Sequence, residues 1–234
     1  MTLGIMQPYF FPNLGHFSLI NQVDKWVVFD PVQFIRHGWI ERNRILKPGG
    51  DWQYISVPLV KHQRNTLIQD IKIRANDPWK NKLLSQIQHY KKRAPYYSNV
   101  VQLIKDCFDF ETESIARLNT HILEKTCTYL GIDFEYEIFS KMNLNLDIDG
   151  PGDWALEISK ELNAQQYINP IGGQELFESE AFKKNGIEIK FLDFKNVAYK
   201  QKGDPFEAGL SIIDVLMFNS VEETREMLTN FSLV

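Results

Sequence analysis

Two short apolar runs near the start of the chain, residues 3–6 and 26–29, each end abruptly in polar residues and prolines. Runs of this length predict buried strands of a parallel sheet, because strands covered on both faces carry few polar residues. In open α/β sheets, ligands bind beyond the carboxyl ends of the strands. The polar side chains that follow the two runs therefore predict half of a small-molecule site. These side chains are Gln7, Asp30, Gln33, Arg36, Arg42 and Asn43.

The rest of the chain alternates between strand-like and helix-like segments. This alternation favours an α/β fold with a mainly parallel, Rossmann-like sheet and helices on both faces. The predicted strands cover residues 3–6, 26–29, 39–46, 52–59, 67–73, 134–139, 166–169 and 187–194. The predicted helices cover residues 17–23, 79–92, 96–108, 113–130, 152–162, 172–185, 211–218 and 221–230.

A helical block interrupts this alternation at about residues 77–131. We expect Asp77 to cap its first helix, with Pro78 at the first helical position, and Gly131 to close its last helix. No linker-like composition or internal repeat divides the chain. We therefore predict a single α/β domain over residues 1–234 with a helical insertion.

Charge and composition restrict the class of partner. The formal net charge of -4 does not favour nucleic acid or an anionic membrane as the main partner. No apolar stretch reaches the roughly 18 residues that span a bilayer, and we expect no signal peptide. Cys107 and Cys127 are expected to be reduced core thiols, and the histidines and cysteines lack metal-binding spacing. We expect a cytoplasmic protein without a metal site or cofactor.

The segment after the first predicted strand, residues 12–17, contains Gly15 and His16. A glycine lets the backbone approach a ligand, and imidazole titrates near neutral pH, so that His16 is a candidate acid or base. The alternative is a turn glycine and a capping histidine. The segment partly resembles the His-x-Gly-His signature of the nucleotidyl transferase superfamily, although Asn13 stands at the first histidine position. That resemblance keeps open an enzyme that uses a nucleoside triphosphate and Mg²⁺.

Arg36, Arg42 and Arg44 place three permanent positive charges close together in the sequence. The planar guanidinium suits a phosphate or a carboxylate, and we favour Arg36 and Arg42 over Arg44 for this role. Asp30 is a candidate to orient an amine or accept a proton, and Trp39 is a candidate apolar wall for a base or sugar. The alternative for the charged residues is surface ion pairs, which contribute little to stability.

Asn169, Gly172 and Gly173 lie between a predicted strand and a predicted helix start. This arrangement is typical of an anion-binding cradle, although a tight turn explains the two glycines equally well. They are candidates for ligand binding on that basis.

A last cluster contains Tyr199, Gln201, Ser211 and Asp214. We predict that Ser211 is a helix N-cap and that Asp214 completes a capping box with it. This structural interpretation competes with a role in ligand binding.

These segments together resemble the WbqC-like family, whose founding members are encoded in bacterial O-antigen gene clusters. The resemblance covers nearly the whole chain, and the ordered set of motifs is specific. At position 16 the family pattern has an aromatic residue such as tyrosine, whereas this chain has His16. The matching pieces are residues 7–12 with Gly15, residues 30–34, Arg36 with Trp39, Arg42 with Asn43, residues 169–173, Tyr199 with Gln201, and residues 210–214.

The resemblance implies a transferase that N-acylates the amine of a nucleotide-linked amino sugar in O-antigen or polysaccharide biosynthesis. The implied acyl group is an aminoacyl group such as glycyl, and the implied donor is an activated one such as a thioester on an aminoacyl carrier protein. The remaining alternative is a non-catalytic binding protein of a polysaccharide-assembly complex.

The chemistry of that reaction assigns roles to the matching residues. Asp30 or His16 is the candidate base, the amide side chains are candidate donors to the oxyanion or the sugar, and Arg36 and Arg42 are expected to hold the diphosphate. The full set of expected substrate-binding residues is Gln7, Tyr9, Gln33, Arg36, Trp39, Arg42, Asn43, Asn169, Gly172, Gly173, Tyr199, Gln201, Ser211 and Asp214.

Overall fold

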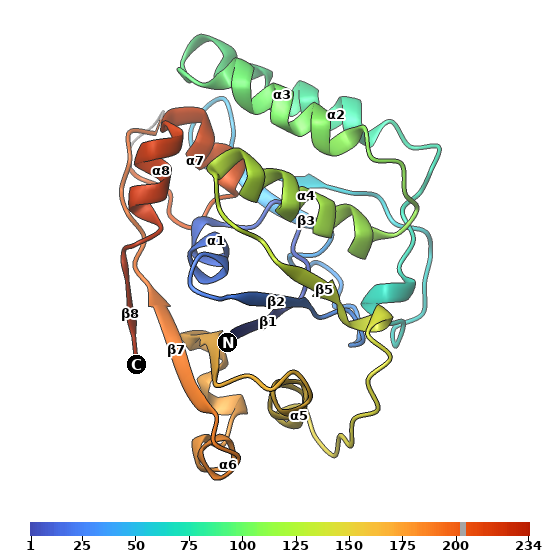
Figure 1. Cartoon of the computed structure of the whole chain (residues 1–234). Helices are drawn as coiled ribbons and strands as arrows, with labels where there is room; N and C mark the ends of the chain where they lie inside the picture. Colours follow the sequence, from blue (N-terminus) through green and yellow to red (C-terminus); the bar gives the residue numbers. More distant parts are fainter. Residues whose placement is uncertain (202–204) are drawn as a thin grey trace.

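The structure, a computed structural model, describes residues 1–201 and 205–234. Its centre is a six-stranded sheet with the strand order β5-β2-β1-β6-β7-β8 (Figure 1). Neighbouring strands are parallel except β8, which is antiparallel to β7. The predicted α/β fold with a mainly parallel sheet is therefore confirmed. The strands are β1 (Thr2–Met6), β2 (Lys25–Val28), β5 (Tyr136–Ile138), β6 (Gln166–Pro170), β7 (Glu188–Phe194) and β8 (Phe231–Leu233).

Side chains alternate across this sheet and form an apolar layer on each face. Leu3, Val27 and Tyr167 belong to the smaller layer, which they share with residues of α5 (Asp153–Glu161) and α6 (Ser179–Lys184). Their side chains are almost completely buried.

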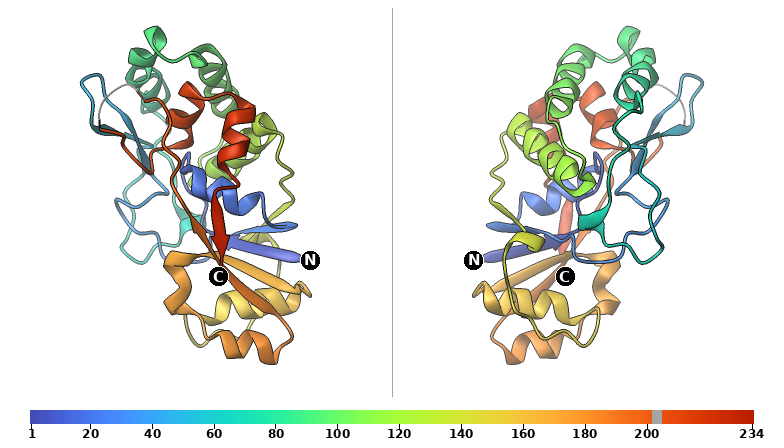
Figure 2. Two further views of the ribbon diagram at one scale, coloured as in Figure 1. Left: turned by 90° about the vertical axis from the view of Figure 1, so that its left-hand side faces the viewer. Right: turned by 90° about the vertical axis from the view of Figure 1, so that its right-hand side faces the viewer.

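The larger apolar layer lies on the opposite face of the sheet. Trp26, Val28 and Ile168 pack there in one cluster with residues of α1 (Leu14–Ile20) and α4 (Ile115–Leu130). Figure 2 shows the helices on both sides of the sheet. This two-sided cover explains why the strands carry nearly continuous apolar sequence.

A second, antiparallel sheet of two strands, β3 (Arg42–Leu46) and β4 (Trp52–Ser56), precedes the helical block. The helices of the block share the larger apolar layer with α1. Gly131 closes α4 in the left-handed conformation with φ 64°, as predicted. The remaining helices are α2 (Trp79–Gln86), α3 (Tyr97–Phe108), α7 (Ile212–Phe218) and α8 (Val221–Met227).

The strand predicted over residues 67–73 is wrong. The segment instead contains the 3-10 turn η1 (Ile68–Asp70), flanked by isolated bridges. Ile68 and Ile71 are three residues apart and both are buried. Burial on one side at that spacing matches the three-residue repeat of a 3-10 turn rather than the two-residue repeat of a strand.

The first helix of the block starts and ends differently from the prediction. Pro78 rather than Asp77 is the N-cap, and the Asp77 carboxylate lies 3.9 Å from the Arg74 guanidinium. The helix stops after α2, and the 3-10 turn η2 (Gln88–Lys92) follows. The tighter repeat of η2 directs Tyr90 into the core, where it is buried.

The C-terminal part also departs from the prediction. The helix expected over residues 172–185 is replaced by the 3-10 segment η4 (Ile171–Leu176) and the short α6. Gly172 and Gly173 weaken a regular helix at this point. The helix expected to reach residue 230 ends with α8, and the three residues of β8 add an unpredicted edge strand.

The loop between β1 and α1 is fixed to the helical block by Asn119 of α4. This side chain is fully buried, and its amide donates to the carbonyls of Pro8 at 2.8 Å and Ile40 at 2.9 Å. Buried carbonyls without a donor are costly, and a proline-rich loop has few N–H groups of its own. Asn119 therefore holds the first loop and the segment before β3 against α4.

Replacing Asn119 by alanine is expected to lower the free energy of unfolding by about 2–5 kcal/mol, because two buried carbonyls lose their donors. Asn185→Ala is the matched control, since it removes one exposed bond to the Ala181 carbonyl and should cost less than about 1 kcal/mol. Urea denaturation followed by tryptophan fluorescence measures both. Equal losses in the two variants would contradict the anchoring role of Asn119.

Candidate functional site

Two cavities open at the tip of β1, at the carboxyl edge of the parallel sheet. Met6, the last residue of β1, lines a cavity of about 440 Å³, here named the His16 cavity. The next residue, Gln7, lines a second cavity of about 1060 Å³, here named the arginine cavity. The chain connects β1 to β2 on one side and β6 to β7 on the other. Such a switch point is where open α/β sheets bind ligands.

The His16 cavity brings together segments that are far apart in the sequence. Its walls come from the first loop, from β3 and the turn before it, from η4 and from β7. Arg44, which the sequence ranked behind Arg42, also lines it, and Phe194 closes one side. Five predicted site residues line this cavity: Tyr9, His16, Trp39, Asn43 and Gly172.

His16 is only 6% exposed, and its ring lies 5.2 Å from that of Trp26 and 5.5 Å from that of Tyr9. Among the described residues its Nε2 has no hydrogen-bond partner. Burial lowers the pKa of His16 to about 3, because the charged imidazolium is poorly solvated there. The imidazole is therefore neutral at physiological pH and a weak base.

The arginine cavity contains three other predicted residues, Gln7, Gln33 and Arg36, together with Arg64. The Gln33 side chain donates to the Arg64 carbonyl at 2.8 Å. The Arg36 guanidinium contacts the ring and the carbonyl of His62, both at 3.5 Å. No ion pair among the described residues involves Arg36 or Arg64. Two guanidinium groups are therefore available to a ligand.

The other walls of the arginine cavity are mostly apolar. Phe29, Phe34 and Trp154 supply aromatic surfaces, and Asp149 adds a carboxylate. Aromatic walls with a few charged groups are typical of small-molecule sites.

Arg42 lines neither cavity. Its guanidinium lies 3.9 Å above the Tyr54 ring, and it donates to the His37 carbonyl at 2.6 Å. Arg42 thus stabilises the hairpin of β3 and β4 in this structure. Arg36 and Arg42 do not line a common cavity, so the expectation that they hold one ligand together is not supported.

Asp30 is buried at the end of β2 and also lines neither cavity. One carboxylate oxygen accepts from the Ser140 N–H at 3.0 Å and the other from the Ser140 hydroxyl at 2.7 Å. Burial raises the pKa of Asp30, and these hydrogen bonds oppose the rise. The contacts join the loop after β2 to the segment after β5.

Asn43 and Ser211 both bind the carbonyls of the first loop. The Asn43 amide donates to Phe10 at 3.0 Å and to Phe11 at 2.9 Å, and the Ser211 hydroxyl donates to Phe11 at 2.8 Å. Ser211 also accepts from the Ile213 N–H, which confirms it as the N-cap of α7. The donors of these two side chains are therefore used inside the protein.

Asp214 does not complete a capping box with Ser211, so that part of the prediction is wrong. Its fully buried carboxylate instead accepts from the hydroxyls of Tyr90 and Tyr199. Burial raises the pKa of Asp214, whereas these hydrogen bonds lower it. The Gln201 amide donates to the Tyr199 hydroxyl at 3.0 Å, so that a continuous network leads from Asp214 to Gln201.

Asn169 and Gly173 form a local contact at the start of η4. Asn169 accepts from the Tyr167 hydroxyl at 2.8 Å and donates to the Pro170 carbonyl at 2.8 Å. A Cβ atom on Gly173 would lie 2.3 Å from the Asn169 amide nitrogen, so a larger residue there would force the Asn169 side chain to move, whereas Gly172 faces open space in the His16 cavity. The two glycines therefore have different surroundings.

Two arginines that line the cavities were not expected there from the sequence: Arg64 was not singled out, and Arg44 was ranked behind Arg42. Residues two apart on a strand share a face, so strand geometry alone does not separate Arg42 from Arg44. The stacking of Arg42 on Tyr54 separates them. Arg64 lies in a polar loop without a recognisable motif, and we find no sequence signal for it.

The chain is similar to a known protein family over nearly its whole length. A model of the WbqC-like protein family matches residues 7–226. The chain belongs to the WbqC-like protein family. This WbqC-like chain is also 25% identical over 235 residues to "Uncharacterized protein Rv1507c" of Mycobacterium tuberculosis (strain ATCC 25618 / H37Rv), covering 97% of this chain and 96% of that protein. No solved structure matches it significantly.

Neither a membrane-spanning helix nor a metal-binding cluster is present among the described residues. None of the helices there has the length and apolar character that a membrane crossing requires. No group of three or more His, Cys, Asp or Glu side chains in that part of this WbqC-like protein lies where it could hold a metal ion. Cys107 and Cys127 are free and buried, as the sequence predicts.

The lowered pKa of His16 predicts a pH-dependent stability. An unfolded chain protonates this histidine near pH 6.5, whereas the folded protein keeps it neutral down to about pH 3. Its contribution is therefore complete above pH 6.5 and is lost as the pH falls, by about 2 kcal/mol between pH 7.5 and pH 5. Urea denaturation at these two values should show a smaller loss for His16→Gln than for the wild type. The exposed His37→Gln should keep the wild-type loss, and identical losses in all three would refute the assignment.

Proposed function

We propose that this protein is a cytoplasmic transferase that N-acylates the amine of a nucleotide-linked amino sugar in O-antigen or polysaccharide biosynthesis. The acyl group is an aminoacyl group such as glycyl, and its donor is a thioester on an aminoacyl carrier protein. Membership of the WbqC-like family supports the proposal. The observation that carries it is the set of groups in the arginine cavity.

The arginine cavity has the groups that a nucleotide sugar needs. Arg36 and Arg64 offer planar N–H forks that form no ion pair among the described residues, and such forks match the oxygens of a diphosphate. Phe29 and Trp154 offer flat surfaces for a nucleobase or a sugar. The volume of about 1060 Å³ suits a ligand of this size, whereas the His16 cavity of about 440 Å³ is too small for it.

Asp149 supports an amino sugar as the ligand of the same cavity. It lies on the wall of the arginine cavity together with the two arginines. Opposite charges attract strongly where water is partly excluded. A carboxylate at this point favours a ligand that carries an ammonium group besides its diphosphate.

Amide formation then requires attack of the amine nitrogen on the acyl carbon. The C–N bond forms, the bond to the thioester sulfur breaks, and the sulfur leaves with the electron pair and takes up a proton. His16 is a weak base because burial lowers its pKa to about 3, and Asp30 is bound to Ser140 away from both cavities. Holding the amine and the thioester together therefore supplies much of the rate.

A dTDP-linked amino sugar should raise the melting temperature of the wild-type protein. Arg36→Ala and Arg64→Ala should each weaken its binding about tenfold or more, because a charge-assisted hydrogen bond is lost. Arg74→Ala removes an exposed arginine paired with Asp77 and should leave the binding unchanged. Absence of any shift at millimolar nucleotide sugar in the wild type would overturn the proposal.

Turnover separates the transferase from a binding protein. With a dTDP-linked amino sugar and a glycyl thioester, mass spectrometry should show a product heavier by one glycyl group. A nucleotide sugar whose amine is already acetylated should bind but give no product. Binding without product from either sugar would support the non-catalytic alternative, and Mg²⁺-dependent release of pyrophosphate from ATP would support the nucleotidyl transferase alternative.

A further inference from the structure

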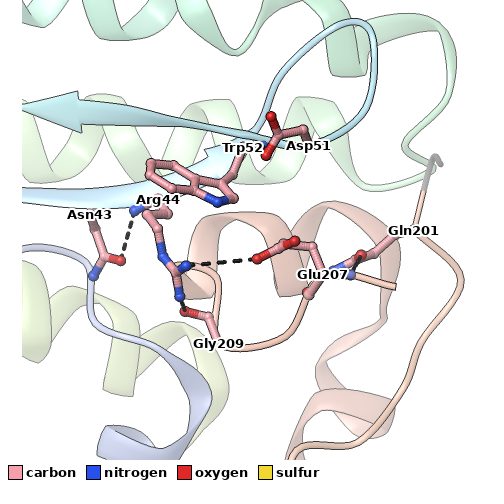
Figure 3. Close-up of polar contacts among 7 residues, drawn as sticks. All are labelled: Asn43, Arg44, Asp51, Trp52, Gln201, Glu207 and Gly209. Carbon is pink, nitrogen blue, oxygen red and sulfur yellow. Dashed lines mark hydrogen bonds and ion pairs between the residues drawn. The ribbon is translucent and has the colours of Figure 1, made fainter. Parts of the chain in front are cut away.

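Arg44 is an arginine whose hydrogen-bonding capacity is largely unused. A guanidinium has five N–H donors. Among the described residues, its only acceptors are the Gly209 carbonyl at 3.4 Å and the Glu207 carboxylate at 3.7 Å, which is too long for a hydrogen bond (Figure 3). Its Nε is buried without a partner among these residues. The side chain is 23% exposed and lines the His16 cavity.

The position of Arg44 is nevertheless fixed. Its guanidinium lies 5.6 Å from the Trp39 ring and 5.3 Å from the Trp52 ring. Its backbone N–H donates to the buried Asn43 side chain at 2.8 Å. An arginine oriented by aromatic rings loses little conformational freedom when it binds a ligand.

The segment that carries Glu207 is also held in place. Gln201 accepts from the Glu207 N–H and donates to the Glu207 carbonyl, each at 2.8 Å (Figure 3). Gln201 in turn bonds to Tyr199, whose hydroxyl donates to Asp214 at 2.7 Å. The buried network described above therefore keeps a carboxylate near Arg44 but does not bring it into direct hydrogen-bonding contact.

The cavity around Arg44 favours one class of ligand. Arg44 is the only permanently charged side chain among the residues that line it, so an anionic group is favoured there. Tyr9, Trp39 and Phe194 add aromatic walls, and the C–H face of a pyranose ring stacks on such walls. The volume of about 440 Å³ accommodates one ring with one charged substituent.

We infer that the His16 cavity is a second ligand site, which binds a pyranose-sized molecule by placing its phosphate or carboxylate group on Arg44. Glu207 competes with that anion, because its carboxylate faces the same guanidinium. This inference goes beyond the proposed function, since it stands whether or not the arginine cavity binds a nucleotide sugar.

Three sugars with one carbon skeleton test it: glucose, glucose 6-phosphate and glucuronate. Calorimetric titrations use the Arg36→Ala, Arg64→Ala double variant of the full chain, so that the arginine cavity does not contribute. We expect at least one of the two anions to bind about tenfold or more tightly than glucose. The anion that binds better distinguishes a phosphate ligand from a carboxylate ligand.

Substitutions in the same background locate the site. Glu207→Gln should tighten binding of the anion about threefold to tenfold by removing the competing charge. Glu161→Gln, at an exposed position on α5, is the matched control and should leave it unchanged. Arg44→Met should abolish the preference for the anion over glucose. If the Arg44→Met variant does not fold, the titration of Glu207→Gln tests the inference by itself. Equal binding of the three sugars, or unchanged binding in Glu207→Gln, would overturn the inference.

Discussion

The loop between β1 and α1 depends on hydrogen-bond donors that distant segments supply. Pro8 and Pro12 remove two N–H groups from this loop, and its buried carbonyls need partners that the loop itself does not provide. Asn43 of β3, Asn119 of α4 and Ser211 before α7 provide them. The hairpin, the helical block and the C-terminal helices therefore meet at this loop. Both cavities lie beside this junction, so their walls depend on it.

The sequence predicted the parts of the fold that hydrophobic pattern alone determines. β1 and β2 were found because both of their faces are buried, which leaves an uninterrupted apolar run. Residues 67–73 were misread, because alternating apolar residues at short range fit a strand and a 3-10 turn almost equally well. β8 was missed because three residues at a sheet edge carry too little pattern to be recognised.

The sequence placed the candidate site residues in one region but did not show how they are organised. The polar residues after β1 and β2 do lie at the carboxyl edge of the sheet, yet they divide between two cavities and the interior. The sequence around Asp214 could not show that its carboxylate accepts a hydrogen bond from Tyr90, which lies 124 residues earlier. That hydrogen bond replaces the predicted capping role. Likewise, only the packing of the hairpin decides that Arg42 covers Tyr54 while Arg44 faces a cavity.

Met6 and Gln7 are consecutive residues that open into different cavities, because successive side chains at the end of a strand point to opposite sides. Within the described residues, the two cavities have no lining residue in common. Substitutions in separate surroundings usually act independently. For the two proposed ligand sites, this separation would let related proteins change what one side of β1 recognises and retain the specificity of the other side, so that a common scaffold could serve many pairs of ligands.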